Sequence, residues 1–209
     1  MSGVNGNADG GSVVYTVGHS NVTQEAFIAL LKQHGIQVLV DVRSQPYSKY
    51  VPHFNAGVLK PAILAAGMKY LYLGKELGGR PDEKRYYDSD GHVLYGLVAE
   101  NDEFKAGIER LLRGAREHGV ALMCNEENPA ECHRRLLVGR VLVEKGVRVL
   151  HIRGDGRIEP EEELAAAEQR SKAGQQEFAF AEHERSVRPV WKSTRSVSQA
   201  RQQKRSSEP

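Results

Sequence analysis

Five short apolar segments alternate with four segments of helical periodicity between residues 13 and 152, and this alternation constrains the fold more than any other feature. Strands that alternate with helices imply a parallel sheet, because each return to the same sheet requires a right-handed crossover. We therefore predict a single-domain α/β fold with an open, mostly parallel five-stranded sheet and helices on both faces. The expected strands cover residues 13–17, 36–42, 69–73, 120–124 and 147–152, and the expected helices cover 23–35, 58–66, 101–118 and 136–145.

The chain divides into three parts by composition. Residues 1–12 are rich in Gly, Asn and Ser, so we expect a disordered N-terminal tail, and residues 13–156 form the α/β domain. Residues 157–209 read as a charged, mostly disordered tail with a short helix over 160–170. From residue 185 onward there are seven basic residues and one acidic residue. Such a tail could contact nucleic acid, or it could simply be solvated.

No apolar run is long enough to span a membrane, and the N-terminal residues lack a signal-peptide pattern. We expect a cytoplasmic protein with no membrane partner. Such a compartment keeps thiols reduced, so catalytic, metal-binding or structural roles are favoured over a disulfide for the two cysteines, Cys124 and Cys132.

The carboxyl ends of parallel strands share one edge of the sheet, and open α/β sheets bind their ligands there. The residues that follow the expected strands should therefore meet in one crevice, whatever the strand order. The segments concerned are Gly18-His19-Ser20-Asn21, Asp41-Val42-Arg43, Leu77-Gly78-Gly79-Arg80, Cys124-Asn125-Glu126 with Cys132-His133-Arg134, and Arg153-Gly154-Asp155.

Cys132 and His133 lie where the helix after residue 135 should begin. Free N–H groups at a helix start lower a thiol pKa and bind anions, so Cys132 is a candidate nucleophile, as is Cys124 at its strand end. Both cysteines can equally be buried structural residues. His133 and Arg134 can grip a phosphate or carboxylate, or they can cap the helix and pair with nearby carboxylates.

Asp41 and Glu126 each end a strand, where they could serve as general base and acid or as the two carboxylates of a glycosyl-transfer site. Arg43 could instead simply neutralise Asp41. Cys124, Cys132 and His133, with His19, are zinc-ligand types, but their spacing is not that of paired zinc motifs. We therefore predict no cofactor, with zinc as the disfavoured alternative.

Several motifs together resemble the domain of unknown function 488 (DUF488) family over about residues 13–156. They are Tyr15-Thr-Val-Gly-His-Ser-Asn, Val40-Asp-Val-Arg-Ser-Gln-Pro, Phe54-Asn55, Leu77-Gly-Gly and Cys124-Asn-Glu with Cys132-His-Arg. The resemblance implies a compact α/β domain, Rossmann-like or rhodanese-like, and no settled reaction. It implies site positions at His19, Ser20, Asn21, Asp41, Arg43, Cys124, Glu126, Cys132, His133 and Arg134.

Asp41-Val-Arg is also similar to the strand end of rhodanese-like sulfurtransferases, in which an active cysteine ends a later strand. The acidic segment after Cys124 would repel an anionic persulfide, which weakens that similarity.

Three functions follow as hypotheses. The first is a hydrolase or glycosyl-transfer enzyme acting on a nucleotide or nucleic acid, with Asp41, Glu126, His133, Cys124 and Cys132 as catalytic candidates. Substrate-binding candidates are His19, Ser20, Asn21, Arg43, Phe54, Asn55, Gly78, Gly79 and Arg134, and Tyr47, Tyr50, Tyr86 and Tyr87 could stack with Phe54 on bases. The second is cysteine-dependent sulfur transfer or redox chemistry, and the third is a non-catalytic nucleic-acid-binding module.

Overall fold

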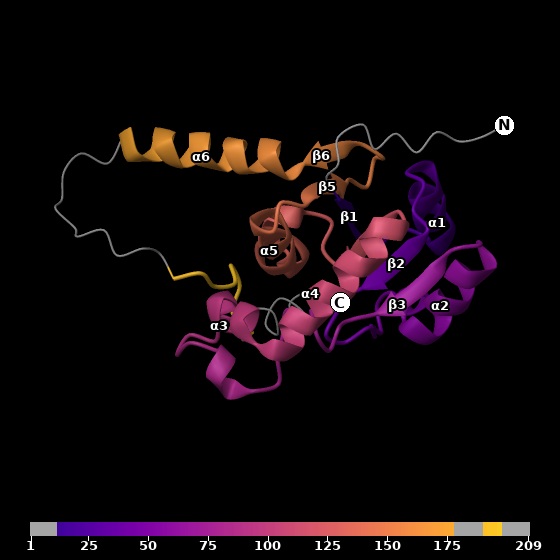
Figure 1. Cartoon of the computed structure of the whole chain (residues 1–209), viewed down its shortest axis with the longest axis horizontal. Helices are drawn as coiled ribbons and strands as arrows, with labels where there is room; N and C mark the ends of the chain where they lie inside the picture. The colour runs from indigo at the N-terminus through magenta and orange to yellow at the C-terminus, as the bar shows by residue number, and fades with distance from the viewer. Residues whose placement is uncertain (1–11, 178–189, 198–209) are drawn as a thin grey trace.

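The computed structural model describes residues 12–177 and 190–197. One sheet has the strand order β3-β2-β4-β1-β5-β6 (Figure 1). The strands are β1 (Val13–Gly18), β2 (Val38–Asp41), β3 (Lys69–Tyr72), β4 (Val120–Cys124), β5 (Arg148–Ile152) and β6 (Ile158–Pro160). The first five are parallel, and β6 pairs antiparallel with β5. The predicted mostly parallel α/β sheet is confirmed.

The predicted number of five strands was wrong by one. β6 is only three residues long, and it follows the turn at Gly156, whose φ of 88° few residues other than glycine adopt. Its sequence, Ile-Glu-Pro, has neither an apolar run nor a clear alternation, so it carries no strand signal before the chain folds back on β5.

Helices cover both faces of the sheet, and each face has its own apolar core. α1 (Gln24–Gln33) and α2 (Ala56–Ala65) pack on one face through residues such as Phe27 and Leu59. α3 (Tyr95–Glu100), α4 (Asp102–Glu117) and α5 (Arg140–Glu144) pack on the other through residues such as Ile108 and Leu142. A π-helical turn (Arg134–Gly139) leads into α5, and 3-10 turns occupy Pro52–Phe54, Lys84–Tyr86 and Pro129–Glu131.

Local signals explain where the two clearest helices begin. The Thr23 hydroxyl accepts a hydrogen bond from the N–H of Ala26, which caps α1, and Gly35 follows the helix with a φ of 64°. The side chain of Asn101 accepts from the N–H groups of Glu103 and Phe104 and caps α4 in the same way.

Regular structure extends beyond residue 156, where we expected the domain to end. The strand β6 leads directly into the helix α6 (Glu161–Glu177). Arg135 forms ion pairs with Glu161 (2.8 Å) and Glu168 (2.6 Å), and these contacts fix α6 beside the turn that precedes α5. The short helix expected over 160–170 corresponds to the first part of α6. The N-terminal tail through residue 11 and residues 178–189 and 198–209 lie outside the described residues.

Residues 190–197 pack against the body, although we expected no order there. Trp191 donates from Nε1 to the carbonyl oxygen of Leu136 (2.8 Å), and the N–H of Ser193 donates to the carbonyl oxygen of Val93 (2.9 Å). Ion pairs join Lys192 to Asp88 and Arg195 to Glu131. This segment therefore lies against the body of the protein, next to α3.

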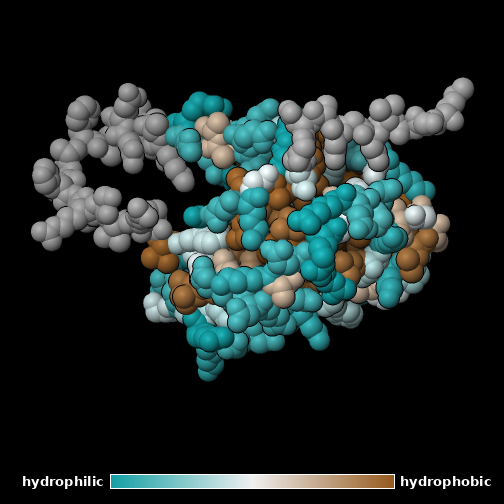
Figure 2. Space-filling view, viewed as in Figure 1, coloured by the Kyte–Doolittle hydropathy of each residue, from teal (hydrophilic) through white to brown (hydrophobic). Residues whose placement is uncertain are grey.

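The surface agrees with these layers. Figure 2 shows hydrophilic residues over most of one side of the molecule and a group of hydrophobic residues near its centre, over α5 and the strands behind it. An apolar groove of about 500 Å³ lies between α5 and α6. Among the described residues, no helix is long and apolar enough to cross a membrane.

Candidate functional site

The carboxyl ends of β1, β4 and β2 lie side by side in the sheet, because β4 pairs with both of the other strands. The main chain continues this pairing into the loops. The N–H of His19 donates to the carbonyl oxygen of Cys124 (3.0 Å), and that of Ser20 donates to the carbonyl oxygen of Asn125 (2.8 Å). The loops after β1 and β4 are thus held together at this edge. Four of the five segments expected to converge contribute residues to the pocket there, whereas no residue of Arg153-Gly154-Asp155 lines it.

A pocket of about 290 Å³ opens above these strand ends. Seven of the expected site residues line it, namely His19, Ser20, Arg43, Gly79, Cys124, Glu126 and His133. Residues 193–197 also contribute to its wall, so the C-terminal segment is part of the pocket.

Four side chains from the end of β4 and the loop after it converge at the base of the pocket. The Sγ atoms of Cys124 and Cys132 lie 3.1 and 3.2 Å from Oε2 of Glu126. The same sulfurs lie 3.6 and 4.0 Å from Nδ1 of His133. Both cysteines are buried and free of a disulfide. We call this group the Cys-Glu-Cys-His cluster.

His133 has a fixed orientation in this cluster. Its Nε2 atom donates to the carbonyl oxygen of Val42 (2.9 Å), so Nδ1 faces the two sulfurs. A β-carbon at Gly79 would lie 2.5 Å from Cγ of His133. Glycine at this position therefore lets the loop pack directly on the imidazole ring.

The two thiols differ in their pKa values. Burial by itself would raise the pKa of Cys132, but the hydrogen bond with Cys124 and the positive charges of Arg134 and His133 hold that pKa well below its ordinary value. The hydrogen bond with Cys132, together with burial, raises the pKa of Cys124 well above its ordinary value. The pair therefore shares one thiol proton more readily than it releases two.

Burial and the nearby Cys132 raise the pKa of the Glu126 carboxyl. Burial acts to lower the pKa of His133, but the hydrogen bond and the negative charge of Cys132 outweigh it, so the pKa of His133 is raised. The contacts with Cys132 thus oppose the effect of desolvation at His133 and add to it at Glu126.

His19 is held neutral on the facing wall. Its Nδ1 lies 2.8 Å from the carbonyl oxygen of Ser20, and its Nε2 lies 2.8 Å from Oδ1 of Asn125 and 3.2 Å from Nη1 of Arg43. The ring stacks on Phe54 with centroids 4.1 Å apart. Burial and the charge of Arg43 lower the pKa of His19 to about 4.

Asp41 does not line the pocket. It is fully buried, and its two oxygens accept from Nε (2.8 Å) and Nη2 (2.6 Å) of Arg43 and from the hydroxyl of Tyr70 (2.6 Å). These contacts support the alternative in which Arg43 neutralises Asp41. They leave Asp41 without access to a substrate in this structure.

Arg134 also lies behind the pocket rather than in it. It is fully buried, and it donates to the carbonyl oxygens of Glu126 and Glu127 (2.7 Å for the latter) and to the Thr16 hydroxyl (3.2 Å). These guanidinium N–H groups are the ones that we expected to bind a substrate anion. The arginine instead fixes the main chain of the loop that carries the cluster.

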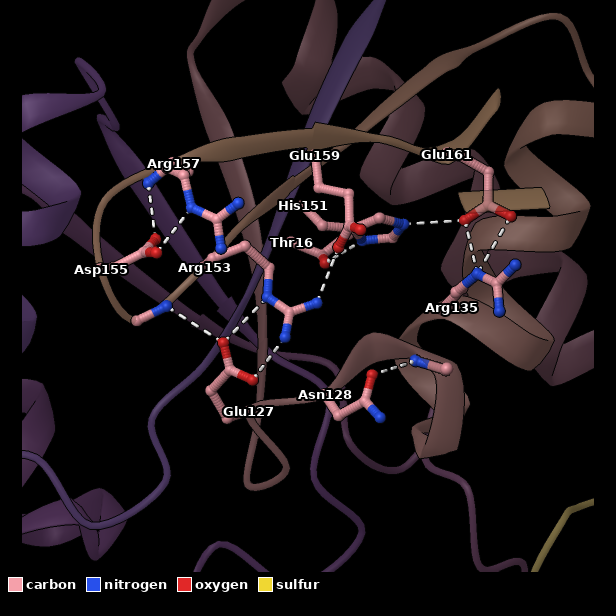
Figure 3. A network of polar contacts seen from close by, with 12 residues as sticks. Thr16, Glu127, Asn128, Arg135, His151, Arg153, Asp155, Arg157, Glu159 and Glu161 are labelled. Atoms are coloured by element: carbon pink, nitrogen blue, oxygen red, sulfur yellow. Dashed lines mark hydrogen bonds and ion pairs between the residues drawn. The ribbon is translucent and has the colours of Figure 1, made fainter. Parts of the chain in front are cut away.

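A polar network extends this support towards β5 and β6 (Figure 3). Arg153 pairs with Glu127 through two hydrogen bonds of 2.9 and 2.7 Å. Behind it, His151 joins the Thr16 hydroxyl (2.7 Å) to Glu161 (2.7 Å). The loop after β4 is thus anchored to the neighbouring edge of the sheet.

Other expected residues have supporting positions. Phe54 is buried under His19, Asn55 accepts from the N–H of Ser48 (2.6 Å), and Asn21 is exposed outside the pocket. A β-carbon at Gly78 would lie 2.3 Å from the carbonyl oxygen of Gly74, so this glycine permits a close main-chain approach. Of the aromatic residues proposed for base stacking, only Tyr47 lines the pocket.

Sequence reasoning missed Tyr95 and Arg195 as pocket residues. Tyr95 begins α3 within a segment that has no clear periodicity, and burial raises its pKa well above the ordinary value. Arg195 comes from the basic tail, where a single arginine carries no positional signal. Neither residue could be placed from its immediate sequence.

Comparison with known proteins adds family membership but no reaction. The family model described as "Domain of unknown function DUF488" matches residues 23–141. The chain has no match among the curated proteins. A crystal structure from Shewanella putrefaciens CN-32, named "Putative phosphatase (DUF442)", aligns with 63% of this chain and 63% of its own, at 15% identity and a TM-score of 0.37.

Proposed function

This chain belongs to the DUF488 family, and because that name assigns no reaction, we propose from the site itself that the protein is a hydrolase with Glu126 as its acid–base group. Two carboxylates line the pocket among the described residues. Glu131 forms an ion pair with Arg195, whereas Glu126 forms none with any described residue and lies between two thiols. This carboxylate at the base of the pocket, bound by thiols and not by a cation of the described residues, is the observation that carries the proposal.

The glycosyl-transfer form of this hypothesis loses support. It needs two carboxylates on opposite sides of the scissile bond. Asp41 is buried and bound by Arg43 and Tyr70, so only Glu126 of the expected pair reaches the pocket. Hydrolysis with Glu126 as the single acid–base carboxylate is consistent with a buried Asp41 and with Glu126 in the pocket.

For the substrate we propose a nucleotide or one nucleotide unit of a single-stranded nucleic acid. Arg80 and Arg195 line the pocket and could bind a phosphate, and the exposed ring of Tyr47 offers an apolar face for a base. A volume of about 290 Å³ suits one small ligand or one unit of a longer one. Hydroxyls of Ser20 and Ser44 could hold its polar edge.

The test is turnover of nucleotides and single-stranded oligonucleotides by the wild type and by the variant Glu126→Gln. We expect the variant to lose turnover by about a hundredfold or more while it retains binding, because the amide preserves size but cannot accept a proton. Glu109→Gln is the matched control and should retain turnover, because this exposed carboxylate pairs with Lys145 outside the pocket. Equal turnover by Glu126→Gln and the wild type would refute the role of Glu126.

A second candidate, cysteine-dependent sulfur transfer or redox chemistry, draws support from the lowered pKa of Cys132 beside His133. It predicts rapid alkylation of one thiol below neutral pH. If both thiols react only near their ordinary pKa of about 8.5, this candidate fails.

A further inference from the structure

The Cys-Glu-Cys-His cluster has a geometry that acid–base chemistry alone does not require. The ligand atoms of Cys124, Cys132 and His133 all lie within 4.8 Å of one another. A tetrahedral zinc ion with bonds of about 2.0–2.3 Å separates its ligand atoms by roughly 3.3–3.8 Å. The Sγ atoms of Cys124 and Cys132 lie 3.6 and 4.0 Å from Nδ1 of His133, which is close to that range.

The hydrogen bonds around His133 have the form expected of a metal ligand. A ligating histidine usually donates its other ring N–H to a carbonyl or carboxylate, which fixes the ring and leaves the ligating nitrogen unprotonated. Here Nε2 of His133 donates to the carbonyl oxygen of Val42, and Nδ1 faces the sulfurs. The close packing of Gly79 holds the ring in place.

The charges near the cluster also favour a bound metal ion. Arg134 is fully buried, yet no carboxylate of the described residues forms an ion pair with it, and its hydrogen bonds go to neutral oxygens. A buried guanidinium is costly without a counter-anion. With a metal ion bound, two thiolates and the Glu126 carboxylate would carry three negative charges, which one divalent ion and the Arg134 guanidinium would balance.

We propose that Cys124, Cys132 and His133 bind one zinc ion, with the fourth position open to the pocket beside Glu126. Two thiolates and an imidazole are donors that suit zinc over magnesium or calcium. Three protein ligands with an open fourth position are typical of catalytic rather than structural zinc sites. Cys124, His133 and Glu126 all line the pocket, so a substrate would reach that position.

This inference rests on the proposed hydrolytic function and deepens it by naming the nucleophile. A water at the fourth position would give one proton to Glu126 and attack the electrophilic atom of the substrate as hydroxide. The bond to the leaving group then breaks, and the leaving group takes that proton from Glu126. The reaction consumes one water and needs no oxidant or reductant. Thiolates bound to zinc are not available for sulfur transfer, so the zinc site opposes the second candidate function.

The experiment measures the metal content of the full chain, purified without chelators and without added metal. We expect about one zinc per chain, and its loss from Cys124→Ser, Cys132→Ser and His133→Asn. His92→Asn is the matched control, because His92 belongs to the other group of potential ligands, with Asp88 and Asp90, and should leave the zinc content unchanged.

Wild-type protein provides a test that does not depend on folded variants. After a chelator has removed bound metal, Co²⁺ should give the absorption of tetrahedral thiolate coordination, and Zn²⁺ should then displace it. Both cysteines should resist alkylation with zinc bound and react once the metal is removed. Metal-free wild type that binds neither ion with a Kd below about 1 μM would overturn the proposal.

The failure of this inference and that of the proposed function give different results. Turnover that persists in metal-free protein would refute the catalytic role of zinc and leave hydrolysis by Glu126 standing. One tightly bound zinc in both the wild type and Glu126→Gln, with no turnover of any nucleotide by either protein, would refute the hydrolase and leave the metal site.

Discussion

The α-carbon of Gly18 packs against the main-chain carbonyl of Glu126, so closely that a β-carbon at residue 18 would lie 1.8 Å from that oxygen. Because the Arg134 guanidinium donates to the same carbonyl oxygen, the loop cannot move aside without breaking that hydrogen bond. The position of Glu126 in the pocket therefore depends on the absence of a side chain at residue 18.

Gly18→Ala should destabilise the protein by about 1–3 kcal/mol or more, because the extra carbon forces the loop after β4 away from β1. Urea unfolding measures the change. Gly57→Ala is the control, since open space surrounds this helical glycine and alanine should be neutral or stabilise by about 0.5 kcal/mol. Similar effects of the two substitutions would contradict the close contact between Gly18 and Glu126.

Asp41→Asn should lower the free energy of unfolding by about 3–5 kcal/mol, because it leaves the buried Arg43 guanidinium without its counter-charge. Thermal and urea denaturation measure this loss. Asp155→Asn breaks the exposed pair with Arg157 and should have no measurable effect. A stable Asp41→Asn variant would instead return Asp41 to the list of candidate catalytic residues.

The stability of the protein should decrease as the pH is lowered, because His19 takes up a proton more readily in the unfolded chain than in the folded protein. Its pKa is lowered from 6.5 to about 4 in the folded protein, so the unfolded chain binds the proton first as the pH falls. This contribution is fully present above pH 6.5, is lost progressively as the pH falls to about 4, and amounts to about 3 kcal/mol at most.

NMR titration of the imidazole measures the pKa of His19 directly, with His19→Gln to assign the signal. Unfolding free energies measured at several pH values should show a smaller decline for His19→Gln than for the wild type between pH 6.5 and 4. An imidazole that titrates near 6.5 would contradict the burial of this ring beside Arg43.

Trp191 is the sole tryptophan of the chain, so its fluorescence reports whether residues 190–197 pack on the body. Ser193→Pro removes the N–H that donates to Val93, and Pro also distorts the adjacent chain. We expect a red shift of the emission and more quenching by iodide. Ser193→Ala, which keeps the N–H and loses only the hydroxyl contact, should shift the emission less. Unchanged emission in both variants would show that the segment does not pack there in solution.

Hydrophobic periodicity by itself determined the layers of this protein. The apolar runs that end at Gly18, Asp41 and Cys124 are strands buried in a parallel sheet, and parallel strands bring their carboxyl ends to one edge whatever their order. For that reason His19, Glu126 and His133 could be assigned to one crevice before the strand order was known.

The partner of each side chain was decided only by the tertiary structure. The sequence allowed Arg134 to bind a substrate anion and Asp41 to act as a base, but packing turned Arg134 onto two carbonyl oxygens and enclosed Asp41 between Arg43 and Tyr70. Such choices depend on side-chain directions of a few ångströms, which no periodicity encodes.

The features that the sequence did not predict depend on contacts between segments that lie apart along the chain. The pairing of Ser193 with Val93 joins segments separated by a hundred residues, and β6 forms only because the turn after β5 returns Ile158 to Ile152. The two cysteines and His133 likewise meet at one point because the loop after β4 folds back between Cys124 and Cys132. Their spacing in the sequence indicated a shared loop, and only the folded loop shows a common centre for their three donor atoms.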